Sequence, residues 1–139
     1  MKKQQIEMVT DVKGPPYGLW IQGKWHAVTL ILDDEIIMDA DECTYQFHGD
    51  SVTCLSRKRA RGSTWESSHS SYRLDTKKKP KEICFFDFPD RSHPPRASAY
   101  DLQKDQLLLC DFSRYAEGVP REIKRGDGLR LITLVRARK

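Results

Sequence analysis

Long apolar runs are missing from this 139-residue chain. No segment approaches the roughly 18 consecutive apolar residues of a membrane-spanning helix. Residues 1–14 are polar, where a secretory signal would carry an apolar core. We therefore expect a cytoplasmic protein that does not associate with membranes.

Cysteine is also sparse, with four residues and no C-x-x-C pair. Structural zinc sites and dithiol redox motifs usually place two cysteines at that close spacing. The cysteines are Cys43, Cys54, Cys84 and Cys110. We expect reduced thiols packed as small hydrophobic side chains.

Signs of catalysis are equally scarce. None of the four histidines, His26, His48, His69 and His93, lies at helical i, i+4 spacing from another. His69 is flanked by serines, but neighbours on a strand point to opposite faces and do not form a dyad. The acids of residues 33–42 lack the order of a calcium loop. The sequence therefore predicts a protein that is not an enzyme, with no catalytic residue, no metal and no cofactor.

The composition and length of the chain are typical of one small folded domain. Hydrophobic residues make up 38% and aromatic residues 9%, against 32% charged. A chain of this length builds one core. We predict a flexible leader over residues 1–18 and a single domain over residues 19–139.

Short alternating runs are separated by Gly, Pro, Asp and Lys about every 8 to 12 residues, the rhythm of a sandwich or barrel. The runs span 20–32, 43–48, 51–55, 63–74, 82–88, 96–102, 106–112 and 129–136. Residues 33–42 read as either a short helix or an edge strand. We predict an all-β fold, a single antiparallel barrel of about eight strands with at most one short helix, because closure removes exposed edges.

One hairpin has a predictable register. Gly49 and Asp50 favour a two-residue turn, which would place Phe47 opposite Val52 and Tyr45 opposite Cys54. Cys43 and Cys54 then become diagonal neighbours whose Cβ atoms lie about 7 Å apart, too far for a disulfide. We predict that they are not bridged.

Several motifs resemble those of a known fold family. Gly23-Lys24-Trp25 is similar to the G-x-W signature that opens lipocalin-like (calycin) barrels, and Arg136 lies where such folds place an arginine across the tryptophan. Residues 72–83 resemble the Y-x-L-D-x-x-K-x-P-K-x-I segment of an uncharacterised lipocalin-like domain family abundant in planctomycete bacteria. Residues 100–110 resemble the Y-x-L…D-x-L-x-x-C hairpin of that family. The resemblance covers about residues 19–136.

The resemblance implies a barrel or half-barrel able to hold a ligand, although the family has no established activity. A guanidinium over an indole face is worth about 1 kcal/mol or more, so Trp25 and Arg136, with Gly23, are expected to form a structural staple between the first and last strands. Alternation and the resemblance predict six inward residues as ligand contacts: Tyr45, Phe47, Tyr72, Phe86, Tyr100 and Leu108. The predicted function is non-catalytic binding of a small apolar or amphipathic molecule.

The net charge of +4 supports a second hypothesis. Basic residues gather at residues 57–61, 77–81 and 136–139. Arg57, Lys58, Arg59 and Arg61 are the candidate polyanion contacts of a protein-interaction or regulatory module, with an acidic protein favoured over nucleic acid as the partner. A cavity in the barrel would favour the ligand-binding hypothesis, and a filled interior would favour the interaction module.

Overall fold

The computed structural model describes residues 20–37, 41–58, 65–86, 95–114 and 118–137. These segments form nine strands, and no helix among them is long and apolar enough to cross a membrane. The strands are β1 (Gly23–Leu32), β2 (Glu35–Ile36), β3 (Asp41–His48), β4 (Ser51–Lys58), β5 (Trp65–Asp75), β6 (Lys81–Phe86), β7 (Arg96–Leu102), β8 (Gln106–Phe112) and β9 (Leu129–Arg136).

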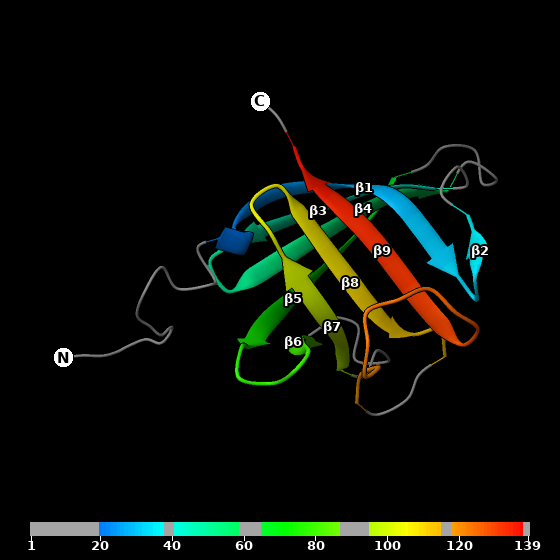
Figure 1. Ribbon diagram of the computed structural model, residues 1–139. Helices are drawn as coiled ribbons and strands as arrows, with labels where there is room; N and C mark the ends of the chain where they lie inside the picture. Colours follow the sequence, from blue (N-terminus) through cyan, green and yellow to red (C-terminus); the bar gives the residue numbers. More distant parts are fainter. Residues whose placement is uncertain (1–19, 38–40, 59–64, 87–94, 115–117, 138–139) are drawn as a thin grey trace.

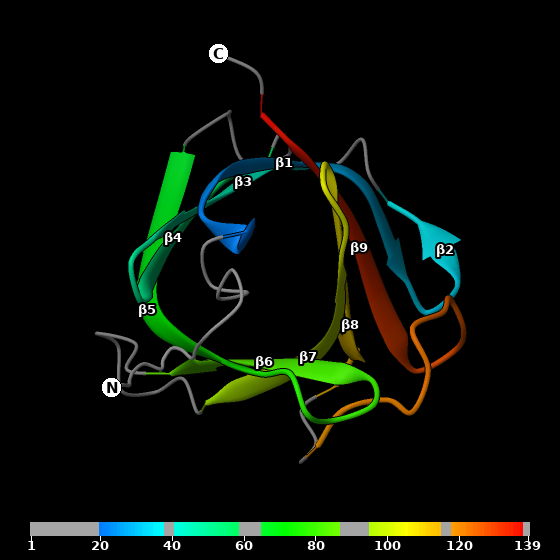
Figure 2. The ribbon, with the colours of Figure 1, turned by 60° about the vertical axis from the view of Figure 1, so that its left-hand side comes forward.

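Eight of the strands close into an antiparallel barrel. Each strand from β3 to β8 pairs with the next, and β1 completes the ring by pairing with both β3 and β9. Figure 2 looks into this ring, with the helical turn at Trp20 and Ile21 lying across it. The prediction of an all-β barrel of about eight strands is confirmed.

The strand β2 settles the ambiguity of residues 33–42 in favour of an edge strand. It pairs with the end of β1 alone and lies outside the ring (Figure 2). Asp33 and Asp34 make the turn between the two strands with φ angles of 51° and 68°. Aspartate tolerates this left-handed region better than most residues because its short side chain bonds locally.

The hairpin of β3 and β4 has the predicted register. Phe47 pairs with Val52 and Tyr45 pairs with Cys54. Gly49, with a φ of 62°, occupies the turn. Cys43, Tyr45 and Phe47 of β3 therefore face the interior, together with Val52 and Cys54 of β4.

Part of the barrel exterior is covered by the connection between β8 and β9. Asp33 accepts hydrogen bonds from Ser113 Oγ at 2.8 Å and from the backbone N–H of Gly128 at 2.9 Å. Arg125 binds Asp34 at 2.6 Å. Cys110, fully buried on this outer side, donates to the carbonyl of Lys124. The connection, drawn in orange in Figure 1, is thus anchored to the β1–β2 turn.

The main core occupies the barrel interior toward the end where Trp25 lies. Its fully buried members come from strands on all sides of the ring. They include Ile21, Trp25, Ile83, Leu107 and Leu134, each with no exposed surface. This end of the barrel is filled by side chains.

Candidate functional site

At the filled end of the barrel Arg136 contacts Trp25, the two residues for which a staple is predicted. The guanidinium carbon of Arg136 lies 4.3 Å from the centre of the Trp25 ring. Arg136 also donates to the backbone carbonyls of Gln22 at 2.9 Å and Trp20 at 2.6 Å. Gly23 has a φ of 108°, and a Cβ there would lie 3.5 Å from Nη1 of Arg136. The arginine therefore fixes the chain entering β1 to the end of β9.

Three predicted ligand residues, Phe47, Tyr72 and Tyr100, are inward but belong to the packed core. Phe47 and Tyr72 meet edge to face, with ring centroids 5.0 Å apart. The hydroxyl of Tyr72 donates to the carbonyl of Gly49 at 2.7 Å. Tyr100 is 2% exposed within the same cluster. These side chains fill the barrel and do not line its cavity.

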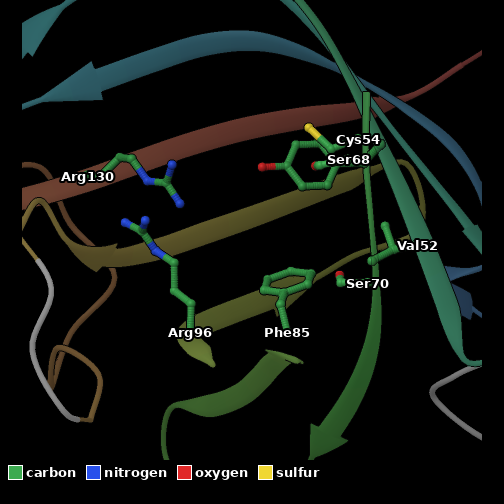
Figure 3. Close-up of a pocket in the computed structure, with 8 residues that line it drawn as sticks. Val52, Cys54, Ser68, Ser70, Phe85, Arg96 and Arg130 are labelled. Carbon is green, nitrogen blue, oxygen red and sulfur yellow. The ribbon is translucent and has the colours of Figure 1, made fainter. Parts of the chain in front are cut away.

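A cavity of about 220 Å³ occupies another part of the interior. Figure 3 shows its wall, to which β4, β5, β6, β7 and β9 contribute labelled side chains. The lining residues are Tyr45, Val52, Cys54, Ser68, Ser70, Phe85, Arg96 and Arg130. Tyr45 is the member of the predicted ligand set that the cavity includes.

Two arginines of this wall share one buried carboxylate. Asp111, 2% exposed, accepts hydrogen bonds from Arg130 Nε at 2.9 Å and Nη2 at 2.8 Å. It also accepts from Arg96 Nη2 at 2.9 Å and from Ser98 Oγ at 2.7 Å. The trio of Arg96, Arg130 and Asp111 therefore carries one net positive charge (two guanidiniums and one carboxylate). We call it the arginine–aspartate trio.

The two arginines of the trio lower the pKa of Asp111. Burial acts to raise the pKa of Asp111, but the hydrogen bond and charge of Arg130, with the charge of Arg96, outweigh it, and the pKa lies below its usual value. Asp111 is thus ionised at neutral pH. Arg96 keeps 41% of its side chain exposed, so this end of the barrel is accessible to solvent.

One thiol of the cavity wall, that of Cys54, has a second thiol beside it. The sulfur atoms of Cys43 and Cys54 lie 3.6 Å apart and are not bridged. Both side chains point inward from adjacent strands. The distance between the two sulfur atoms is therefore shorter than the roughly 7 Å expected between the Cβ atoms of a diagonal pair, because the thiols extend toward each other. The hydrogen bond from Cys43 and the charge of Arg130 outweigh burial and lower the pKa of Cys54.

Two solved structures of bacterial proteins are similar to this chain at low sequence identity. A lipocalin-like protein from Bacteroides uniformis matches with a TM-score of 0.53 and 16% identity, over 82% of this chain and 96% of that one. An uncharacterised protein from Bacteroides eggerthii matches with a TM-score of 0.51 and 14% identity, over 82% of this chain and 98% of that one. The fold is lipocalin-like.

No protein-family model matches this chain, and no curated protein matches it significantly. The resemblance to the planctomycete domains is therefore supported at the level of the lipocalin-like fold. The motif of residues 72–83 lies on the hairpin of β5 and β6, where Tyr72 and Ile83 supply core side chains.

The inward assignment of Phe86 and Leu108 was wrong. In β6 the inward positions are Ile83 and Phe85, because Phe85 pairs with Tyr72. Phe86 lies on the opposite face, where Arg73 approaches its ring centroid to 5.3 Å. Leu108 likewise lies between two buried inward residues of β8 and faces outward. Because successive side chains of a strand point to opposite faces, a register error of one residue assigns a side chain to the wrong face of the barrel.

Sequence reasoning did not identify several cavity residues, although strand alternation and hairpin register indicated their positions. The predicted hairpin register already placed Val52 and Cys54 on the face of Tyr45. Ser68 and Ser70 alternate with the inward Tyr72 on β5. Their small polar side chains leave space beside the aromatics. Arg96 and Arg130 gave no such signal, because charged residues on a strand are usually solvent-facing.

Of the remaining sequence candidates, those that the structure describes do not line the cavity. The side chains of Arg57 and Lys58, and all of Arg59 and Arg61, lie outside the described residues, as does the leader 1–18. His26, His48 and His69 are exposed. Among the described residues, no cluster of three or more His, Cys, Asp or Glu could hold a metal ion.

Proposed function

We propose that this lipocalin-like barrel binds a small amphipathic anion in its interior cavity and does not catalyse a reaction. The observation that carries the proposal is the composition of the cavity wall, which combines apolar side chains with a net positive charge. Val52 and Phe85 supply the apolar part, and the arginine–aspartate trio supplies the charge. We also propose that the chain is related to the planctomycete lipocalin-like domains, whose motifs residues 72–83 and 100–110 resemble.

The arginines retain capacity to bind an anion. Within the described part of the chain, Arg96 donates from Nη2 alone, to Asp111 and to the carbonyl of Phe112. Among the described residues no acceptor contacts its Nε or Nη1 hydrogens, which are the donors that we propose for a ligand. Guanidinium groups favour carboxylates and phosphates because their planar donors can bind two oxygens at once.

The size of the cavity limits the ligand. Its volume of about 220 Å³ is far more than a few waters need but is smaller than the roughly 300–1,000 Å³ of sites that enclose drug-sized molecules. It suits a short acid, or the acidic end of a longer chain that leaves through the solvent-accessible end of the barrel. A ligand with its anionic group on Arg96 would place its apolar part near Phe85 (Figure 3).

Calorimetric titration with octanoate and with 1-octanol tests the proposal. The two probes share an alkyl chain and differ in charge, so we expect octanoate to bind at least tenfold more tightly. Arg96→Gln should weaken octanoate binding, while Arg73→Gln, the same change on an exposed outward residue, should leave it unaltered. Equal binding of both probes, or none, would count against an anion site.

A second pair of variants tests the location of the site. Ser70→Leu adds a side chain into the cavity wall, whereas Ser67→Leu adds the same side chain on the exposed outer face of β5. We expect octanoate binding to be lost in the first variant alone. Native mass spectrometry of the protein purified from its own host would then show whether a small anion is carried, and of what mass.

A further inference from the structure

Cys43 and Cys54 are positioned to react with each other. Their sulfur atoms lie 3.6 Å apart on the inward faces of β3 and β4, and both residues are half-buried. Cys54 borders the cavity, which gives a small molecule a route to its thiol. We propose that the two cysteines form a dithiol site that exchanges with small disulfides and is reversibly oxidised to an intramolecular disulfide.

The other two cysteines provide an internal comparison. Cys84 is half-buried on the outward face of β6, with a backbone carbonyl as its sulfur contact. Cys110 is fully buried beneath the β8–β9 connection, and burial raises its pKa. Neither has a second thiol beside it among the described residues. The Cys43–Cys54 pair is therefore the place where an exchange reaction can close intramolecularly.

The surroundings of the pair favour attack by Cys54. Thiolates rather than thiols attack disulfides, and a nearby cation increases the thiolate fraction. The guanidinium of Arg130 lines the same cavity and acts on Cys54 in this direction, as does the hydrogen bond from Cys43. Cys54 is the nucleophile of the proposed exchange, and Cys43 is the resolving thiol.

The exchange balances in two steps. The Cys54 thiolate attacks one sulfur of a small disulfide, RSSR, which forms a mixed disulfide and releases RS⁻. The Cys43 thiolate then attacks Sγ of Cys54, forming the Cys43–Cys54 bond and releasing the second RS⁻. Each released thiolate takes up the proton that its protein thiol lost, so the protein loses two hydrogens and RSSR becomes two RSH.

The diagonal arrangement predicts that the disulfide is easily reduced. The sulfurs must approach from 3.6 Å to about 2.05 Å, and diagonal strand pairs are wider than an ideal disulfide spacing. A bond formed under such constraint is more reducible than a typical structural disulfide. The proposal holds whether or not the cavity also binds an anion, since it depends only on the two thiols and access to Cys54.

Peptide mapping after incubation with bis(2-hydroxyethyl) disulfide, a small uncharged disulfide, tests the proposal. The full-length protein is quenched with an alkylating agent in denaturant and digested with trypsin and with a protease that cleaves before aspartate. Cleavage before Asp50 separates Cys43 from Cys54, so a disulfide appears as a cross-linked peptide pair. We expect that pair to form at least tenfold faster than any modification of Cys84 or Cys110, and to disappear in 2-mercaptoethanol.

Single variants assign the two roles. Cys43→Ser should stop the reaction at a stable 2-mercaptoethanol adduct on Cys54, and Cys54→Ser should suppress both products. Cys84→Ser is the matched control and should behave as the wild type. The proposal is overturned if the wild type accumulates the 2-mercaptoethanol adduct without the cross-link, or if Cys84 reacts as fast as Cys54. The wild-type mapping alone decides this if a variant does not fold.

Discussion

Replacing Asp111 by Asn should weaken the fold and strengthen anion binding at the same time. The variant keeps the shape of the side chain but removes the one negative charge of the arginine–aspartate trio. Breaking a buried ion pair costs about 3–5 kcal/mol. The pair with Arg96 contributes little because Arg96 is 41% exposed, so the bidentate contact with Arg130 dominates the loss.

The expected destabilisation is about 3 kcal/mol, the lower end of that range, since Asn still accepts a hydrogen bond. This corresponds to a melting temperature roughly 10 °C lower for a domain of this size. The matched control is Asp101→Asn, which makes the same change on the exposed outer face of β7 and should cost less than about 0.5 kcal/mol. Urea unfolding of both variants measures the difference.

The binding effect has the opposite sign. Without Asp111 the trio carries two positive charges, and a carboxylate about 5 Å away gains roughly 3 kcal/mol at an effective dielectric constant of about 20. After screening by salt, we expect octanoate to bind about tenfold more tightly to Asp111→Asn than to the wild type. Unchanged stability would refute the structural role of the trio, and unchanged or weaker octanoate binding would refute its role as an anion site.

The dependence of stability on acidic pH should distinguish Asp111→Asn from the wild type. The pKa of Asp111 is lower in the folded state than in the unfolded chain, where it is about 3.9. Its contribution to stability is therefore complete above about pH 4 and is lost as pH falls through the folded-state pKa. The free energy of unfolding of Asp111→Asn should fall less steeply below about pH 4 than that of the wild type. Parallel acid profiles of the two proteins would contradict the pKa assignment.

Three further predictions concern the filled half of the barrel. Trp25→Ala should lower the free energy of unfolding by about 3–5 kcal/mol, measured in urea, because the side chain is fully buried. Arg136→Gln should cost about 1–2 kcal/mol through loss of the cation–π contact and of bonds to backbone carbonyls; no change in melting temperature would reject the staple. Burial, opposed by the hydrogen bond from Gln22, raises the pKa of Tyr72 to about 12, so its contribution is complete below about pH 10 and is lost as pH rises toward 12. Tyr72→Phe should lack this alkaline loss, as followed by circular dichroism.

The fold was largely predictable because strand spacing and turn chemistry act locally. The Gly49-Asp50 turn determined the pairing of Phe47 with Val52, and the structure has that register. The edge strand β2 was ambiguous because its two residues, Glu35 and Ile36, are too few to show a periodicity. Local signals identify strands but carry little information on very short pairings.

The site was less predictable because it depends on contacts between distant strands. Tyr45 was identified by alternation, whereas Arg130 and Asp111 become recognisable only when β8 and β9 are placed side by side. Each charge read alone suggests solvent exposure. Phe86 shows a second limit of prediction from sequence. Phe85 and Phe86 are adjacent and point to opposite faces of β6, and the register between β5 and β6 decides which of them faces inward. The turn at residues 76–80 determines that register.

The pairing of β1 with β9 joins parts of the chain that are synthesised far apart in time. Arg136 contacts the carbonyl of Trp20 across 116 positions of sequence. Contacts of such separation form late and slow the folding of β proteins. Until residues 129–136 leave the ribosome, the edge of β1 that β9 will cover has no partner strand. The nascent chain therefore carries open strand edges on β1 and β8, which are potential aggregation sites, until β9 emerges.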